Sequence, residues 1–399
     1  MKGKCIMNIR MRAFLKEIIS PVFLKNLRGL SKAIRSYYPD YLFGMGKIRS
    51  LKEICIEVTF LCNCRCQMCP LYGIHTDGGK GLLESMKNGK ELAVSEFRKL
   101  FEDLKKLGTE YINFSGGEVF LRKDILEITD LAIKSGFKVS YTSNAGLITQ
   151  EIARKVVEIG VDNITISLDG PKEVHEFIRK ARIYDNIMNA VDWISREKIS
   201  QGRNCPNLNF LCTVSRLNQE HLVELVGIAK EKGLPLTIDP IIFSNEENAD
   251  NTKKELQGNF IKQESFIMSD EIGKIDTDML EKEIETVLLR SKQLNQSVEM
   301  SIVGRKTRKK FFNVPDYSIV KKCFSPWYSC RIDPYGNVYP CSLSVAMGNL
   351  RQNSINEIIN SDKAVNFRKR LKQKGLFDSC KKCCLLYSQN IFWNFLPNI

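Results

Sequence analysis

Six stretches of the chain alternate apolar and polar residues with the two-residue period of a β-strand. They lie at 53–60, 111–114, 138–142, 163–168, 208–214 and 234–241. Stretches with helical periodicity separate them: an apolar stripe from Phe97 to Leu107 follows a predicted N-cap at Ser95, and Thr149 and Gly160 bracket a second helix. Because strands and helices alternate, the sequence predicts an α/β fold with a parallel sheet and right-handed crossovers.

The polar positions of each strand share one face. Parallel strands covered by helices on both sides normally have continuous apolar runs, but here Ile54, Ile56 and Val58 alternate with Glu57 and Thr59. The other strands carry polar residues at the same parity: Asn113, Ser115, Ser140, Thr142, Thr165, Ser167, Asn209, Thr213, Thr237 and Asp239. We therefore predict a sheet curved into a partial (β/α)6 barrel whose polar inner face is a ligand cavity. A flat doubly wound sheet is the alternative, and it would leave these side chains against helices.

The length of 399 residues suits one large domain with a smaller one. We divide the chain into a basic amphipathic N-terminal segment (1–50), the barrel (51–242), a connector (243–320) and a cysteine-rich C-terminal domain (321–399). Within the connector, the acidic, amide-rich stretch 245–258 is predicted as a loop and the stretch 280–294 as a helix.

Composition narrows the class of protein. No run of about 18 apolar residues is present, so no transmembrane segment is expected. Fourteen cysteines without an export signal favour a reducing, cytoplasmic location. Apolar residues of the N-terminal segment recur at helical spacing among basic ones, which fits a helix capping the enzyme body or a peripheral membrane contact. The net charge of +14 permits an acidic partner, but the lysines are scattered, so nucleic acid is not expected.

Candidate chemistry begins directly after the first strand. Cys62, Cys66 and Cys69 stand in a C-x3-C-x2-C register, and Cys64 lies outside it. Three thiolates on one tight loop can hold three irons of a [4Fe–4S] cluster and leave the fourth iron open. An open metal position is typical of a catalytic site. A zinc knuckle or a disulfide loop is the alternative, but no fourth ligand follows nearby.

Three further motifs follow strands two, three and four. They are Ser115-Gly116-Gly117-Glu118, Thr142-Ser143-Asn144-Ala145-Gly146 and Ser167-Leu168-Asp169-Gly170, and Arg179 follows the last of them. With the cysteine loop, this order over residues 52–242 resembles the radical S-adenosylmethionine (SAM) enzymes. Ala145 is an insertion relative to the family's TNG motif. The resemblance implies that SAM is bound by Met68, Gly116, Gly117, Glu118, Ser143, Asn144, Ser167, Asp169 and Arg179.

A second cysteine set follows near the C-terminus. The stretch from Cys323 to Cys341, with Cys380-x2-Cys383, resembles the SPASM domain. This resemblance implies one auxiliary [4Fe–4S] cluster on Cys323, Cys341, Cys380 and Cys383, with Cys384 as the substitute for the fourth ligand. A zinc ion on the same four cysteines is the alternative.

The resemblance implies an enzyme, a radical SAM oxidoreductase or maturase. Such an enzyme reductively cleaves SAM to a 5′-deoxyadenosyl radical, takes its electron from a low-potential donor such as ferredoxin or flavodoxin, and abstracts hydrogen from a substrate. The substrate is left open among a small molecule, sugar, lipid or peptide, and Glu57, Asp239 and Tyr335 are weak candidates for a base. The alternative is a non-enzymatic zinc or iron–sulfur scaffold that binds nucleic acid through a basic surface.

Overall fold

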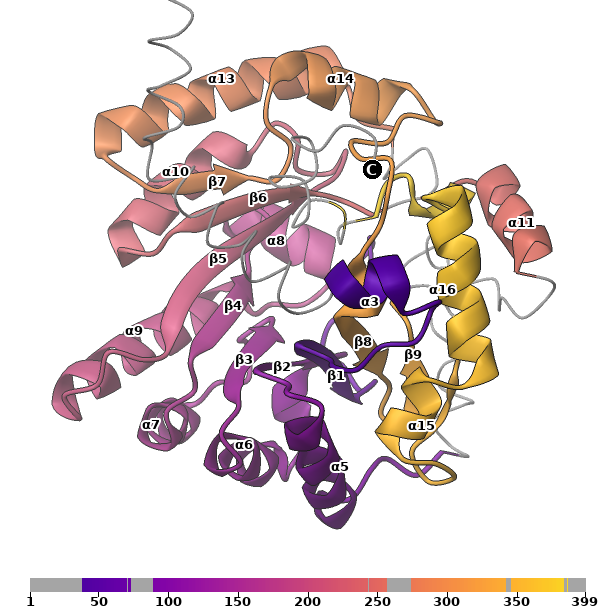
Figure 1. Ribbon diagram of the computed structural model, residues 1–399. Helices are drawn as coiled ribbons and strands as arrows, with labels where there is room; N and C mark the ends of the chain where they lie inside the picture. The colour runs from indigo at the N-terminus through magenta and orange to yellow at the C-terminus, as the bar shows by residue number, and fades with distance from the viewer. Residues whose placement is uncertain are drawn as a thin grey trace, which may run out of the picture.

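The computed structural model describes residues 38–69, 71–72, 89–242, 244–256, 274–341, 346–383 and 386 (Figure 1). Within them, one ten-stranded sheet runs in the order β10-β9-β8-β1-β2-β3-β4-β5-β6-β7. The strands are β1 (Glu53–Thr59), β2 (Tyr111–Gly116), β3 (Lys138–Ser143), β4 (Asn163–Ser167), β5 (Asn207–Val214), β6 (Leu236–Pro240), β7 (Val298–Met300), β8 (Ser329–Ile332), β9 (Asn337–Tyr339) and β10 (Gly348–Asn349).

The six predicted strands are confirmed as β1 to β6, each within two residues of the expected bounds. Neighbouring strands pair in parallel and in chain order, as the alternation of strands and helices predicted. The register runs, for example, from Ile56 to Phe114 between β1 and β2, and from Thr213 to Asp239 between β5 and β6.

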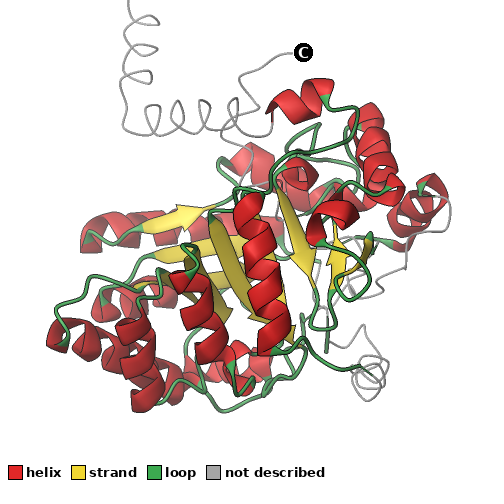
Figure 2. Cartoon of the chain, turned by 60° about the horizontal axis from the view of Figure 1, so that its bottom comes forward, coloured by secondary structure: helices red, strands yellow, loops and turns green. Residues whose placement is uncertain are grey.

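The two faces of the sheet, one formed by the apolar and one by the polar positions of the strands, have different surroundings. Apolar residues such as Ile56, Phe114 and Ile166 have no exposed surface, and the helices cover this side of the sheet (Figures 1 and 2). Polar residues of the other parity, including Ser115 and Thr213, line a cavity. The prediction of a polar, ligand-sized inner face is therefore confirmed, and the flat sheet is not.

Helices connect the parallel strands. They are α5 (Val94–Lys106), α6 (Ile125–Lys134), α7 (Gln150–Ile159), α8 (Lys172–Arg179), α9 (Tyr184–Ser200) and α10 (Leu222–Lys232), with the short η1 (Val119–Leu121). Thr149 caps α7 by accepting from the Ile152 N–H, and Gly160 ends it at φ 87°, as predicted. The predicted cap of α5 is wrong by two residues, because Glu96 reaches back to the N–H of Ala93 and makes Ala93 the cap.

The segment after the barrel adds strands at both edges of the sheet. β7 pairs in parallel with β6, whereas β8 pairs in parallel with β1 and leads into antiparallel β9 and β10. The remaining elements are α3 (Tyr38–Phe43), α11 (Glu246–Glu255), α13 (Thr277–Leu294), α14 (Arg305–Asn313), η3 (Ser325–Trp327), α15 (Ile355–Ile359), α16 (Asp362–Lys374) and η4 (Asp378–Cys380). The cysteine-rich segment is thus continuous with the barrel sheet.

The loop predicted at 245–258 is wrong over most of its length, because α11 occupies it. Asn245 accepts a hydrogen bond from the Asn248 N–H at 2.8 Å, Glu246 and Glu247 lie in the first turn, and basic residues lie in the last. These charges complement the helix dipole. The helix predicted near 280–294 is confirmed as part of α13.

No helix among the described residues is long and apolar enough to cross a membrane. The amphipathic stretch of the N-terminal segment, on which a peripheral membrane contact depended, lies outside the described residues.

Asn245→Ala should lower the free energy of unfolding by about 1 kcal/mol, because the first turn of α11 loses its side-chain acceptor. Urea unfolding followed by circular dichroism measures this change. Asn245→Asp keeps the acceptor and should retain the stability; equal losses in both variants would contradict the capping role.

Candidate functional site

A cavity of about 410 Å³ opens at the carboxyl ends of the barrel strands. This volume lies within the range of about 300–1,000 Å³ that is typical of small-molecule sites. The cavity is lined by Cys62, Cys64, Cys66, Met68, Cys69, Tyr72, Ser115, Gly116, Gly117, Thr142, Ser143, Asn144, Ser167, Arg179, Leu211, Thr213, Asp239, Pro240, Ile241 and Ile242.

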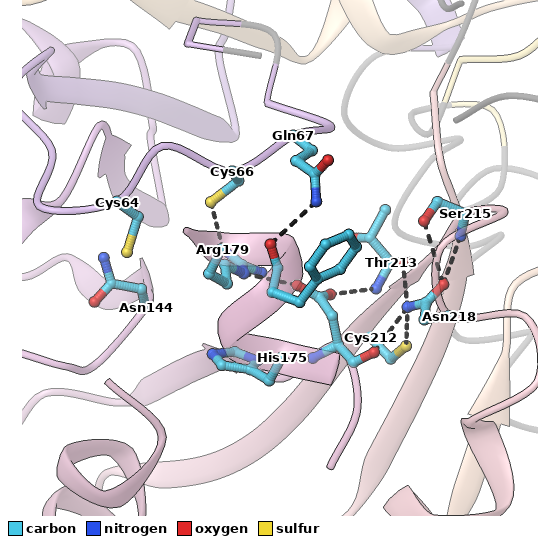
Figure 3. A network of polar contacts seen from close by, with 12 residues as sticks. Cys64, Cys66, Gln67, Asn144, His175, Arg179, Cys212, Thr213, Ser215 and Asn218 are labelled. Carbon is cyan, nitrogen blue, oxygen red and sulfur yellow. Dashed lines mark hydrogen bonds and ion pairs between the residues drawn. The ribbon is translucent and has the colours of Figure 1, made fainter. Parts of the chain in front are cut away.

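The cysteine loop is held against α8. The Arg65 N–H donates to the Arg179 carbonyl at 3.1 Å, and the Gln67 N–H donates to the Ile178 carbonyl at 2.9 Å. The Gln67 side chain also donates to the Phe177 carbonyl, so the loop and the last turn of α8 form one unit (Figure 3). These hydrogen bonds hold the backbone of the cysteine loop at the end of α8.

The surroundings lower the pKa of the Cys62 and Cys66 thiols through a hydrogen bond from Cys64, whereas burial raises that of Cys69 to about 11. Backbone N–H groups of Cys64 and Leu71 donate to the sulfurs of Cys62 and Cys69, each at 3.4 Å. A hydrogen bond from Cys64 and, against the effect of burial, the nearby Arg179 lower the pKa of the Cys66 thiol to about 6. Donors to sulfur are one of the protein's means of tuning an iron–sulfur cluster. Cys64, outside the register, is therefore a donor to its neighbours within the cavity wall.

Two glycines bring the loop after β2 against the backbone of β1. A Cβ on Gly116, whose φ is 130°, would lie 2.2 Å from the Thr59 carbonyl oxygen, and one on Gly117 would lie 2.2 Å from that of Leu61. The Gly117 N–H donates to the Thr59 carbonyl at 2.8 Å. Only glycine permits this approach, and it leaves both backbones on the cavity wall.

Glu118 lies behind the cavity. Its carboxylate has no exposed surface and accepts from the Ser143 hydroxyl at 2.7 Å and the Asn144 N–H at 2.8 Å. Burial raises the pKa of this carboxyl. Asn144 also donates to the Asn63 side chain at 2.8 Å, and the inserted Ala145 takes a left-handed conformation at φ 56°. Glu118 thus ties the loop after β3 to the loop after β2.

Asp169 is the centre of a second buried network. Figure 3 labels three of its neighbours, His175, Arg179 and Thr213. It pairs with Arg179 at 2.6 Å, accepts from the Thr213 N–H at 3.1 Å and has no exposed surface. Arg179 in turn reaches the Cys66 sulfur at 3.6 Å. The Asp169 N–H donates to Nδ1 of His175, whose pKa burial lowers to about 4. His175 is therefore a neutral structural acceptor.

Met68 closes an apolar corner of the cavity by packing with Ile178 and Ile241. Of the three candidate bases, only Asp239 lines the cavity: it accepts from the Ser301 hydroxyl, and burial raises its pKa. Glu57 instead pairs with Arg331 at 2.6 Å, and Tyr335 packs on Phe60.

Seven of the nine residues assigned to SAM line the cavity together: Met68, Gly116, Gly117, Ser143, Asn144, Ser167 and Arg179. Glu118 and Asp169 are not among the lining residues and instead hold the residues that are. Sequence reasoning missed Tyr72, Leu211, Ile241 and Ile242. Only the polar parity of β5 pointed to Thr213, and no sequence signal marks the others.

The second cysteine set also converges. Cys323, Cys341 and Cys383 all raise the pKa of Cys380, after burial itself, so each of them is an electrostatic neighbour of Cys380. Cys330 is buried on β8 next to Ile54, with Cys55 and Arg368 as its electrostatic neighbours. Cys384 lies outside the described residues.

The C-x2-C turn of this set is fastened to the connector. Ser379 donates its N–H to the Thr252 hydroxyl of α11 at 2.9 Å. Lys382 is 3% exposed and donates to the carbonyls of Phe311, Val314 and Tyr317, at and after the end of α14. Such carbonyls at a helix C-terminus have no partner within the helix.

In the described part of the chain, no three His, Cys, Asp or Glu side chains are close enough to share one metal ion. In an iron–sulfur cluster each thiolate binds a different iron, so the thiolates need not be close enough to share one metal ion.

Comparison with known families decides the assignment. Residues 56–229 match the radical SAM superfamily, and residues 323–384 match SPASM, an iron–sulfur cluster-binding domain. The chain belongs to the radical SAM superfamily. It carries a SPASM domain, and the two domains imply SAM and iron–sulfur clusters as its cofactors.

Relatives of this radical SAM protein include two from Methanosarcina barkeri. The chain is 30% identical over 146 residues to Fe-coproporphyrin III synthase, covering 36% of this chain and 35% of the relative. It is 23% identical over 331 residues to AdoMet-dependent heme synthase, covering 82% of this chain and 86% of the relative. The chain thus spans about a third of the length of the first relative.

The fold resembles that of Streptococcus suis SuiB bound to S-adenosylmethionine. The TM-score is 0.60 at 14% identity, covering 98% of this chain and 86% of SuiB. At 14% sequence identity, this likeness shows that the two chains share a fold, and no more.

Asp169→Asn should lower the free energy of unfolding of the radical SAM barrel by about 3 kcal/mol, because it leaves Arg179 charged and unpaired in a buried site. Glu151→Gln breaks the exposed pair with Lys155 and serves as the control, with little change expected. Urea unfolding compares the two. Similar values would contradict the importance of the buried pair.

Lys382→Met should lower the thermal unfolding midpoint, because three carbonyls near the end of α14 lose a buried ammonium donor, although that of Val314 keeps the Tyr317 N–H. Lys381→Met is the matched control, since the adjacent lysine only pairs with Asp316 and Asp378 near the surface. Calorimetry should show a larger fall of the unfolding midpoint for Lys382→Met than for Lys381→Met. The reverse order would contradict the stabilising role of the Lys382 hydrogen bonds.

Proposed function

We propose that this protein is a radical SAM oxidoreductase or maturase. When its cofactors are bound, a [4Fe–4S] cluster on Cys62, Cys66 and Cys69 supplies the one-electron chemistry that cleaves SAM to methionine and a 5′-deoxyadenosyl radical, which abstracts hydrogen from the substrate. The observation that carries this proposal is the single cavity that holds three thiols, two bare glycine backbones and the Arg179 guanidinium.

The cavity residues supply the binding groups. The Gly116 and Gly117 backbones lie on the cavity wall, where the absence of side chains lets them approach the backbone of Thr59 and Leu61. The guanidinium of Arg179 suits a carboxylate such as that of SAM's methionine moiety. The apolar corner of Met68 and Ile241 suits the flat adenine ring.

The hydroxyls of Ser143 and Ser167 and the amide of Asn144 provide the remaining polar contacts of the cavity wall. Glu118 and Asp169 hold this wall in place through Ser143, Asn144 and Arg179. They therefore act as positioning residues toward SAM.

An auxiliary [4Fe–4S] cluster is assigned to Cys323, Cys341, Cys380 and Cys383. This set is supported because Cys323, Cys341 and Cys383 are all electrostatic neighbours of Cys380, and Cys330 is set aside because it lies on β8 with different neighbours. Cys384 remains the alternative fourth ligand. The domain boundaries proposed from the sequence, 51–242 for the barrel and 321–399 for the auxiliary domain, accord with the family matches at 56–229 and 323–384.

The substrate is proposed to be a small molecule or a peptide. The names of relatives include a heme synthase and a PqqA peptide cyclase, and SuiB has been solved with its precursor peptide SuiA. The polar inner face of the barrel accepts either class. A low-potential donor such as ferredoxin or flavodoxin would supply the electron, and the cysteine content favours the cytoplasm, where thiols remain reduced.

Anaerobic reconstitution tests the function. The protein should bind about eight irons, the content of two [4Fe–4S] clusters, and form 5′-deoxyadenosine from SAM with dithionite as the reductant. The Cys62→Ala/Cys66→Ala/Cys69→Ala variant should lose SAM cleavage and keep about four irons. Bound zinc without SAM cleavage would favour the non-enzymatic scaffold instead.

A further inference from the structure

The outer surface of the cysteine loop carries a small basic patch. It is formed by Arg65 from the loop, Phe177 and Lys180 from the end of α8, and Arg182 from the turn that follows; we call it the loop face. We propose that the loop face is the docking surface for a small acidic electron-transfer protein. This inference rests on the proposed function, because that chemistry needs one electron for each SAM cleaved.

The loop face lies next to the proposed cluster ligands. Arg65 directly precedes Cys66, and its N–H is bonded to the Arg179 carbonyl at 3.1 Å. The Arg179 guanidinium lies 3.6 Å from the Cys66 sulfur (Figure 3). Lys180 is the next residue along the chain. Because electron transfer through protein weakens steeply with distance, a donor that docks here would be well placed to reduce a cluster on this loop.

The loop face is exposed, and its positive charge is not neutralised. Arg65, Lys180 and Arg182 are all exposed, and Phe177 keeps 53% of its surface exposed. Arg65 uses its guanidinium on the carbonyls of Cys62 and Cys64, and the Lys180 ammonium lies 4.3 Å from the centre of the Phe177 ring. In the described ranges, none of the three basic residues has a carboxylate within salt-bridge distance, whereas many other basic residues do.

These features fit one kind of partner. Three basic side chains without an acidic partner among the described residues, with an exposed aromatic ring beside Lys180, complement an acidic rim around an exposed redox group. Such charge complementarity chiefly raises the rate of association. In the transfer itself, the donor is oxidised by one electron and the cluster is reduced by the same electron, and no covalent bond changes. The proposed donor class is a flavodoxin, whose flavin and acidic surface meet these requirements.

Two reductants separate docking from chemistry. Dithionite is a small molecule that needs no docking surface, whereas flavodoxin reduced by NADPH and its reductase must bind. Lys180→Glu/Arg182→Glu should lower 5′-deoxyadenosine formation with flavodoxin by about tenfold or more at low salt, within the range that electrostatic steering supplies, and leave the rate with dithionite unchanged. The flavodoxin rate of the wild type should also fall with added salt.

Arg196→Glu/Arg203→Glu is the matched control: it makes the same change of charge at exposed positions near the end of α9. It should retain the flavodoxin rate. Equal flavodoxin rates in the loop-face variant and the wild type, equal losses in both double variants, or a wild type that uses dithionite but not flavodoxin would each overturn the docking proposal. A wild type that fails to cleave SAM even with dithionite would instead overturn the proposed function.

Discussion

The buried pair between Asp169 and Arg179 is the interaction on which the site depends. It joins the end of β4 to the end of α8, and Asp169 also accepts from the backbone of β5. The cysteine loop is bonded to that same end of α8, and Arg179 reaches the Cys66 sulfur. Because neither charge could be left buried alone without a large cost in stability, the position of the loop follows from the pairing of the two.

The barrel was predictable because its signals are local. The sequence alone indicates which face of β1 is inward, because apolar residues alternate with polar ones: Ile54, Ile56 and Val58 with Glu57 and Thr59. The strands β7 to β10 were not predictable, because each has only two to four residues. β7 and β8 pair with strands far away in the sequence, and β9 and β10 extend the sheet from β8. The helix α11 was missed because its polar composition resembles a loop, although Asn245 and the charge order at its ends mark a helix.

The sequence predicted the site well at positions where a residue type has few alternative roles in proteins. The register cysteines, and Gly116 with its close approach to Thr59, fall in this class. Acidic residues have several uses, and sequence motifs do not separate them. Glu118 was expected to face SAM, yet its carboxylate accepts from Ser143 and Asn144, so its own chain occupies it. The direction of a buried side chain depends on which donors the tertiary fold brings beside it.

The continuous sheet has a consequence for how the two cysteine sites relate. Parallel pairing places Ile54 of β1 beside Cys330 of β8, and Glu57 pairs with Arg331 at 2.6 Å. The first cysteine loop follows β1, and Cys341 follows the β8–β9 hairpin, so a hydrogen-bonded ladder rather than a hinge connects the two sites. Ladders of this kind open only with much of the fold. The spacing between the two proposed clusters should therefore be a fixed property of the sheet, and substrate binding would have to adapt to it.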